Sequence, residues 1–184
     1  MNFNFYGRKT AMDLDAKRIK TYRTAYPTTK FVGKRYGEKD KKDGTYGHLW
    51  NEWFNENRFA PLESQIPDPS FVEDGDAYYG MCRILADGTD EYWIGMIMPE
   101  NTEIPEGYNA FMIPACEAVV NWIYGKEPDI YFCDCRKEMA DLGHEWKPLS
   151  SGDLLMAERY VCPRFTEPDE NGKLILDQVY FTAD

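Results

Sequence analysis

Residues 78–98 read YYGMCRILADGTDEYWIGMIM and carry the strongest hairpin signal in the chain. Two apolar runs, Tyr78–Leu85 and Glu91–Met98, flank the short segment ADGT at 86–89. An Asp-Gly pair between such runs is typical of a β-hairpin, because glycine readily adopts the positive φ of a tight turn. The stretch therefore predicts two antiparallel strands.

The segment before this hairpin predicts a strand followed by a helix. Ala25–Gly37 is a predicted strand that ends in Tyr-Gly. Apolar side chains then recur at helical spacing and form one stripe, which consists of Tyr46, Leu49, Trp50, Trp53 and Phe54. Because both tryptophans lie on this stripe, we assign them to the hydrophobic core.

The same order of elements returns in the second half of the chain. Ala118–Gly125 predicts a strand that again ends in Tyr-Gly, and Glu127–Leu142 predicts a second helix. Leu155–Phe165 and Leu174–Phe181 predict a second hairpin. Few residues are identical between the halves, so the repeat is carried by the order of its elements.

We therefore predict an α+β fold of two pseudo-symmetric strand–helix–strand–strand modules. The modules comprise residues 25–98 and 107–184 of a domain that spans 25–184. They share one antiparallel sheet with helices on one face, and a ligand groove lies between the halves. Residues 1–24 form an N-terminal extension in this prediction, with one short helical turn near Asp13–Lys20.

Net charge, cysteine count and the length of the apolar runs exclude several classes of protein. The chain has 184 residues and a net charge of −11, which argues against nucleic acid or an anionic membrane as a partner, since both need a basic surface. Five cysteines are an odd number in a chain of this size and do not indicate a disulfide framework. The run Trp93–Met98 is too short to span a membrane, and Met1–Lys20 lacks the apolar core of a signal peptide. We expect a soluble, cytoplasmic protein.

Glu158 is the main candidate functional residue. It interrupts an apolar strand, and period-two alternation places it on the same face as Tyr160 and Cys162. If that face lines a groove, a partly desolvated carboxylate attracts an organic cation, and each nearby ring adds about 0.5–2 kcal/mol. The same carboxylate could activate water as a general base. The alternative is an exposed glutamate, or one that is paired with Arg83 or Arg164.

Aromatic residues make up 15% of the chain, enough for a cage around a flat or cationic ligand. Ordinary core packing is the alternative for each of them. Neighbouring strand residues point to opposite faces, so Tyr92 and Trp93 cannot both face the ligand, and the sequence leaves open which one does. The candidate ligand-binding residues are Glu158, Tyr160, Tyr92, Trp93, Trp122, Trp146, Tyr79 and Tyr180.

No motif in the sequence indicates a metal or a cofactor. Cys133 and Cys135, even with His144, lack the paired spacing of a structural zinc site. The sequence places neither His48 nor His144 beside a cysteine that it could activate. A phosphate loop and a dinucleotide fingerprint are also missing. We expect no metal and no cofactor.

Four patches follow one another along the chain: YGMC (79–82) with EYWIGMI (91–97), PEGY (105–108) with IPACEAV (113–119), WKPLSSG (146–152) and ERY (158–160). In this order they resemble the GyrI-like small-molecule-binding domain, which is also the effector-binding domain of AraC-type and multidrug-binding regulators. They cover residues 25–184. Lys147 stands where the family has an apolar residue, and Ser150 lengthens one spacing by a residue.

The resemblance implies a stand-alone domain that binds an aromatic or cationic lipophilic xenobiotic, with Glu158 at the base of an aromatic groove. Its first alternative is a hydrolase of strained cyclopropanoid electrophiles, in which Glu158 activates water. Its second alternative is an interaction protein similar to the gyrase-inhibitory members, since a fold does not decide a function. The partner is then a small-molecule ligand, with no direct contact to nucleic acid or membrane, although partnership with a regulator is possible.

Overall fold

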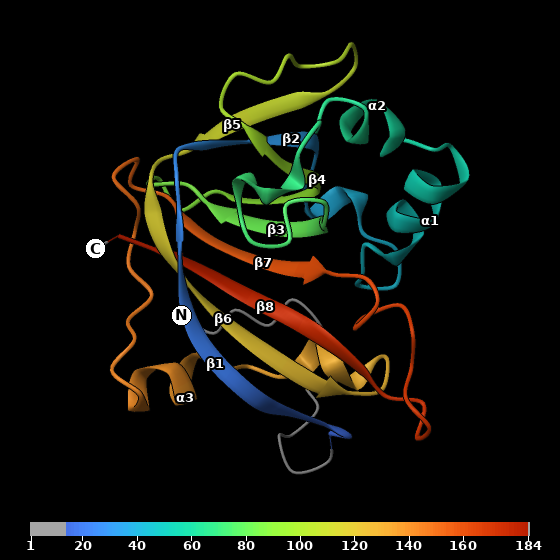
Figure 1. Ribbon diagram of the computed structural model, residues 1–184, viewed down its shortest axis with the longest axis vertical. Helices are drawn as coiled ribbons and strands as arrows, with labels where there is room; N and C mark the ends of the chain where they lie inside the picture. The colour runs from blue at the N-terminus through green and yellow to red at the C-terminus, as the bar shows by residue number, and fades with distance from the viewer. Residues whose placement is uncertain (1–13, 184) are drawn as a thin grey trace.

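The computed structural model describes residues 14–183, and within this range eight strands form one sheet (Figure 1). The helices are α1 (Gly47–Asn55), α2 (Ala60–Glu63) and α3 (Arg136–Asp141), with the short 3-10 helices η1 (Glu38–Asp40), η2 (Pro69–Phe71) and η3 (Asp129–Phe132). The strands are β1 (Ala16–Tyr26), β2 (Thr29–Tyr36), β3 (Tyr78–Ile84), β4 (Asp90–Pro99), β5 (Asn109–Ile113), β6 (Cys116–Gly125), β7 (Leu154–Tyr160) and β8 (Leu174–Thr182).

The strand order confirms the predicted α+β class with an antiparallel sheet. The order across the sheet is β1-β6-β8-β7-β3-β4-β2-β5, so β7 and β3 meet at the centre. Outward from the centre, each half continues with the second strand of its hairpin (β8 or β4) and then with the first strand of its module (β6 or β2). Both predicted hairpins are present, as β3 with β4 and as β7 with β8. In the first hairpin, Gly88 has a φ of +86° and donates its amide to Leu85 O, as the Asp-Gly signal requires.

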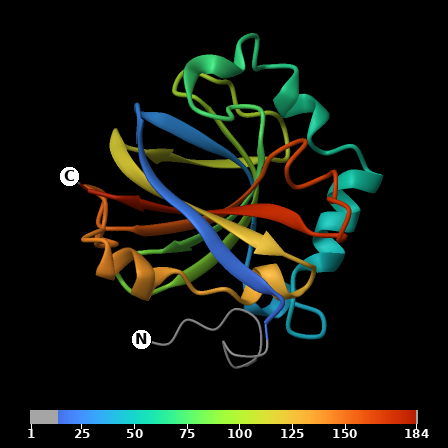
Figure 2. The same ribbon diagram turned by 60° about the horizontal axis from the view of Figure 1, so that its bottom comes forward.

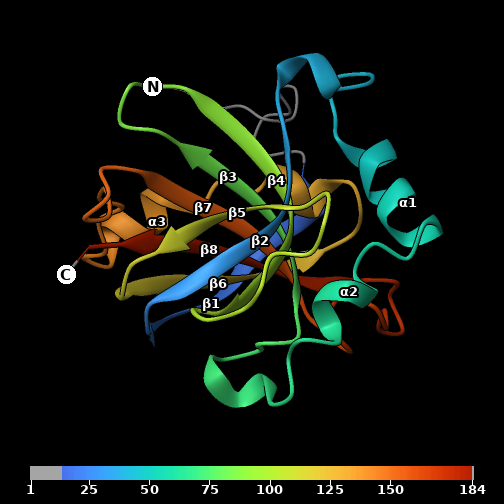
Figure 3. The same ribbon diagram turned by 90° about the horizontal axis from the view of Figure 1, so that it is seen from above.

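A bent two-stranded ribbon joins the two outer edges of the sheet. β1 leads into β2, β5 leads into β6, and the two long strands stay paired across both bends: Tyr26 lies opposite Cys116, and Thr29 opposite Ile113 (Figures 1 and 3). Figure 2 shows β1 running beside β6 over most of its length. The ribbon curls the sheet around a large apolar core on its inner face, which includes Phe31, Tyr79, Trp93 and Phe181.

The outer face of the sheet carries the helices. Leu49 and Trp53 of α1 and Leu62 of α2 pack in a cluster with Tyr92, Ile94, Met96 and Met98 of β4. Met139 of α3 packs against Val119 and Tyr180 of the other half. The predicted placement of helices on one face is therefore confirmed for the three α-helices, whereas Phe71 of η2 packs against the inner core.

Four predicted elements differ from the structure. The strand predicted over Leu155–Phe165 ends at Tyr160, and residues 162–166 form a turn. The helical turn near Asp13–Lys20 is wrong from residue 16 onward, because β1 begins at Ala16 and pairs with β6 (Asp13 itself lies outside the described residues). The strand predicted over Ala25–Gly37 begins at Thr29, after the bend at Pro27. The helix predicted over Glu127–Leu142 is two short pieces, η3 and α3, separated by an extended residue at Cys133. Where the N-terminal extension ends and the domain begins stays a prediction.

Two glycines allow the close pairing of β2 with β4. Gly33 lies opposite Gly95, and a Cβ atom on Gly33 would collide with the backbone of Ile94 and Gly95. We expect Gly33→Ala to lower the free energy of unfolding by about 1–3 kcal/mol, measured by urea denaturation, because the overlap can be relieved only by moving buried backbone.

The matched control for this substitution is Gly47→Ala. Gly47 is the exposed first residue of α1, and only one side-chain atom of Thr45, at 3.7 Å, lies near the position of its missing Cβ. Alanine there should leave stability unchanged or raise it by about 0.5–1 kcal/mol. Equal losses in both variants would contradict the packing role of Gly33.

Among residues 14–183, every helix is too short or too polar to cross a lipid bilayer.

Candidate functional site

Glu158 lies on the outer face of the sheet, inside a group of aromatic rings. Glu158 is 7% exposed, and the Tyr160 hydroxyl donates a hydrogen bond of 2.7 Å to Glu158 Oε2. Both side chains come from β7, two residues apart, which is why they share a face. The Tyr160 ring meets Phe165 edge-on, with 4.7 Å between the ring centroids. Sequence alternation correctly placed Glu158 and Tyr160 together.

α1 and β4 contribute two further aromatic side chains. The Trp50 ring meets the Tyr160 ring at a centroid distance of 4.7 Å and an angle of 67°. Its indole Nε1 donates a 3.0 Å hydrogen bond to the hydroxyl of Tyr92. Tyr92 in turn stacks on Tyr46, with centroids 4.0 Å apart and planes within 2° of parallel. We call Trp50, Tyr92, Glu158, Tyr160 and Phe165 the Glu158 cluster.

A glycine on the central strand makes room for this arrangement. Gly80 of β3 lies directly opposite Glu158 of β7. A Cβ atom on Gly80 would lie 2.5 Å from the Tyr92 hydroxyl oxygen and 3.3 Å from a ring carbon of Trp50. Any larger residue would push these two rings away from the strand next to the carboxylate.

The negative charge of Glu158 acts on three neighbouring side chains. Burial raises the pKa of Tyr92 well above its usual value, and the Glu158 charge raises this pKa further. The same two causes raise the pKa of the Cys82 thiol. Tyr131 of η3 also has a raised pKa, through burial, a hydrogen bond to Glu127 and the charge of Glu158. These phenols and this thiol therefore stay protonated at neutral pH.

The arginines that were considered as partners of Glu158 pair elsewhere. Arg83 bonds the Asp153 carboxylate at 2.7 Å. Arg164 bonds Asp177 and Asp74 on the inner side of the sheet. Glu158 is also buried rather than exposed.

The remaining candidate residues lie outside the Glu158 cluster. Tyr79 and Trp93 lie in the core on the inner face, and Trp122 packs against that core from the same side. Trp146 and Tyr180 are on the outer face but form their own edge-to-face pair beside α3. On β4, Tyr92 lies on the outer face with Glu158 and Trp93 points into the inner core; which of the two faces a ligand stays a prediction. Whether any of these residues contacts a ligand stays a prediction.

Trp50 is the site residue that the sequence analysis placed in the core. The apolar stripe of α1 is wide, and its two edges differ: Leu49 and Trp53 are buried, while Trp50 is half-buried and Phe54 is exposed. Tyr46 and Trp50 lie four residues apart, so their rings lie on the same side of α1. This spacing is the sequence signal that indicates a row of aromatic side chains at the edge of the stripe. No periodicity marked Phe165, because β7 ends at Tyr160 and Phe165 follows in a turn.

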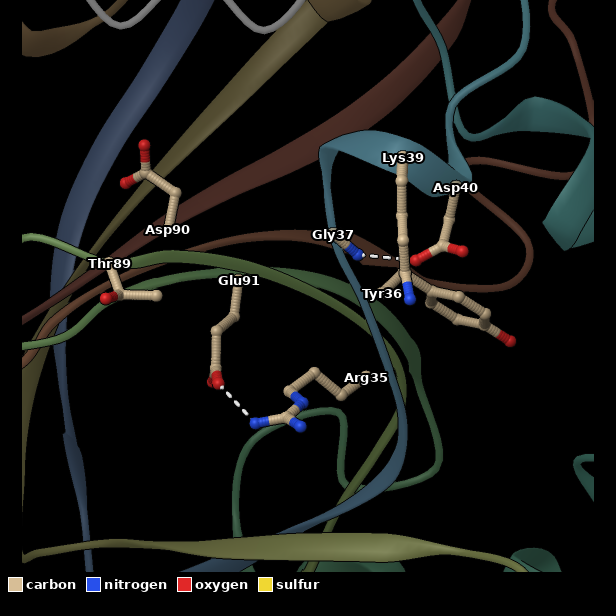
Figure 4. Close-up of a pocket in the computed structure, with 8 residues that line it drawn as sticks. All are labelled: Arg35, Tyr36, Gly37, Lys39, Asp40, Thr89, Asp90 and Glu91. Carbon is tan, nitrogen blue, oxygen red and sulfur yellow. Dashed lines mark hydrogen bonds and ion pairs between the residues drawn. The ribbon is translucent and has the colours of Figure 1, made fainter.

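A second candidate is a charged pocket at the start of β4, with a volume of about 500 Å³ (Figure 4). Its charges largely satisfy one another: Arg35 bonds Glu91 at 3.0 Å, and Asp40 accepts the amide of Gly37. Glu91 also accepts the indole N–H of Trp93. We find no chemical preference in this mixed lining, which consists of Arg35, Tyr36, Gly37, Lys39, Asp40, Thr89, Asp90 and Glu91.

In the part of the chain that the structure describes, no three histidine, cysteine or acidic side chains are grouped as metal ligands would be.

A comparison with protein-family models finds no match, and a comparison with curated protein sequences finds none either. The fold is similar to that of solved structures. One is a candidate bacterial transcription regulation protein from Staphylococcus aureus MU50, with a TM-score of 0.54 and 15% identity over 90% of this chain and 99% of that chain. Another is SAV2435 bound to tetraphenylphosphonium, with a TM-score of 0.57 and 15% identity over 90% of this chain and 94% of that chain. At this level of identity the likeness shows a shared fold.

Proposed function

We propose that this protein binds lipophilic aromatic cations at the Glu158 cluster, as a GyrI-like effector-binding domain does. The observation that carries the proposal is a buried carboxylate held among aromatic rings. Removing a carboxylate from water is costly, and a cation that replaces the lost hydration recovers that cost. Aromatic faces add cation–π attraction and exclude water. A neutral ligand gains binding free energy only from its contacts with the aromatic rings.

The structural comparison supports this choice of ligand class. SAV2435, which shares the fold, was solved with tetraphenylphosphonium, a lipophilic aromatic cation. The candidate transcription regulation protein with the same fold is consistent with an effector-sensing role. The sequence patches shared with the GyrI-like family include ERY at 158–160, the strand that carries Glu158 and Tyr160.

Isothermal titration calorimetry tests the proposal directly. We expect tetraphenylphosphonium to bind saturably at one site per chain, and triphenylphosphine oxide, a neutral relative, to bind at least about tenfold more weakly, which corresponds to about 1.4 kcal/mol. Equal affinity for both compounds would contradict a role for the carboxylate. Absence of saturable binding by either compound would overturn the proposed function.

Trp50 should report on ligand binding by fluorescence. We expect tetraphenylphosphonium to quench the tryptophan emission of the wild type, and Trp50→Phe to remove most of this quenching while calorimetry still detects binding. The phenyl ring keeps an aromatic face beside Tyr160 but loses the indole that emits.

Trp122→Phe is the matched control, because Trp122 packs on the inner face of the sheet. This variant should retain the quenching. If Trp122→Phe abolishes quenching and Trp50→Phe does not, the ligand binds on the inner face and the proposed site is wrong.

The hydrogen bond between Tyr160 and Glu158 favours one alternative, hydrolysis of a strained cyclopropanoid electrophile. The phenol, 2.7 Å from Glu158 Oε2, holds the carboxylate in one orientation and in its ionised form, and an ionised carboxylate can accept a proton from water. Product formation during incubation, followed by mass spectrometry, distinguishes this activity from binding alone. Glu158→Gln would then abolish turnover more completely than it weakens affinity.

A further inference from the structure

Two cysteines, Cys133 and Cys135, pack in one apolar cluster together with Tyr160 and Phe165 of the Glu158 cluster. Cys133 follows η3, and Cys135 caps the start of α3. Between them, Asp134 accepts the backbone amide of Arg136 at 3.0 Å and forms an ion pair with its guanidinium, which fixes the side chain between the two cysteines. Both side chains then pack on the same apolar cluster, which includes Ile123 and Leu176.

The two thiols have opposite properties. Cys133 is half-buried, whereas Cys135 is 1% exposed. A hydrogen bond from the Cys135 thiol lowers the pKa of Cys133, and the Arg18 backbone amide lowers it further against the effect of burial. The same thiol–thiol contact and burial raise the pKa of Cys135. An accessible, more acidic thiol beside a buried one is the arrangement of an attacking cysteine and its resolving cysteine.

The backbone of Cys133 is held from the sheet side as well. The Gln178 side chain donates a 3.2 Å hydrogen bond to the Cys133 carbonyl. Gln178 lies opposite Glu158 in the pairing of β7 with β8. The backbone at Cys133 is therefore tied to a strand of the sheet.

We propose that Cys133 and Cys135 form a reversible dithiol–disulfide site that reacts with small-molecule disulfides. Cys133 attacks one sulfur of the small disulfide as a thiolate, which forms a mixed disulfide and expels the first thiol. Cys135 then attacks the Cys133 sulfur, the Cys133–Cys135 bond forms, and the second thiol leaves. The protons of the two cysteines end on the two released thiols. The cysteines lose two electrons, and the small disulfide gains them.

Reaction of the reduced full chain with oxidised glutathione tests the site. We expect peptide mapping by mass spectrometry to find a Cys133–Cys135 disulfide in the wild type that dithiothreitol reverses. Cys135→Ala should stop at a stable glutathione adduct on Cys133, and Cys133→Ser should form neither product. Circular dichroism establishes that both variants are folded.

Cys162→Ser is the control, since Cys162 is an exposed cysteine outside the pair. It should form the Cys133–Cys135 disulfide at the wild-type rate, within about twofold. A wild-type protein that accumulates a stable glutathione adduct on Cys133 without closing the disulfide would overturn the proposal. So would a Cys133 that reacts no faster than Cys82, which is buried and outside the pair. The wild-type result decides the matter even if a variant fails to fold.

Discussion

Replacement of Glu158 by glutamine should weaken tetraphenylphosphonium binding about 10–100-fold and leave the binding of triphenylphosphine oxide within about twofold. Glutamine keeps the size of the side chain and can still accept the Tyr160 hydroxyl, so the ring arrangement should persist. What it loses is the full negative charge. A cation about 5 Å from a carboxylate at an effective dielectric constant near 20 gains roughly 3 kcal/mol, part of which solvent screening removes.

The measurement is calorimetric titration of both compounds into wild type, Glu158→Gln and Glu170→Gln. Glu170 is an exposed loop residue outside the Glu158 cluster. Glu170→Gln therefore removes the same formal charge from the protein without changing the cluster. It should bind both compounds as the wild type does. An equal loss in the two variants would mean that net charge, and not the Glu158 site, attracts the cation. An equal loss of the neutral compound in Glu158→Gln would point to a disturbed ring cluster.

The strands that carry the site were predictable from local sequence, but one choice of face was not. Alternation correctly placed Glu158 and Tyr160 on one side of β7, where buried and half-buried residues follow each other. β4 offers no such pattern, because all of its residues from Glu91 to Met98 are buried. A strand covered on both faces shows no alternation of buried and exposed residues, so only packing places Tyr92 on the side of Glu158 and Trp93 in the inner core.

Other features depend on contacts between segments far apart in the sequence. β1 is a strand because β6 pairs with it from about 100 residues away, and no local signal in residues 16–24 indicated that partner. The helix predicted over 127–142 is interrupted at Cys133, where the Gln178 side chain of a distant strand bonds the carbonyl. Trp50 shares the periodicity of core residues and differs from them only in what faces it. Spacing predicts that a stripe is buried, but not against which element.

The inner face of the sheet holds a buried ion cluster that should dominate the response to mutation. Arg159 and Asp177 are both fully buried, and the Arg159 Nη2 atom lies 2.6 Å from Asp177 Oδ2. Arg164 also bonds both oxygens of Asp177, at 2.9 and 2.5 Å. Arg159 further donates to the hydroxyls of Tyr22 and Tyr26, so the cluster ties β1 to the central strands.

Asp177→Asn should therefore lower the free energy of unfolding by about 3–5 kcal/mol. Asparagine preserves the volume of the side chain, so no cavity accounts for the loss. The variant leaves two guanidinium groups facing a neutral amide, and the ion pairs that remain to them within residues 14–183 are those with Asp74, 3.2 Å from Arg159 and 2.5 Å from Arg164. Since a domain of this kind has a total stability of about 5–15 kcal/mol, the variant should lie close to its unfolding threshold at room temperature.

Urea denaturation followed by circular dichroism measures this loss, with Asp141→Asn as the matched control. Asp141 forms an ion pair with Lys137 on the surface of α3, where both side chains are largely exposed. Solvent screens such a pair, so the control should unfold at the wild-type midpoint. A loss below about 1 kcal/mol in Asp177→Asn would mean that Asp74 and the tyrosine hydroxyls alone satisfy both arginines. The buried cluster would then fix which strands meet without determining how stable their pairing is.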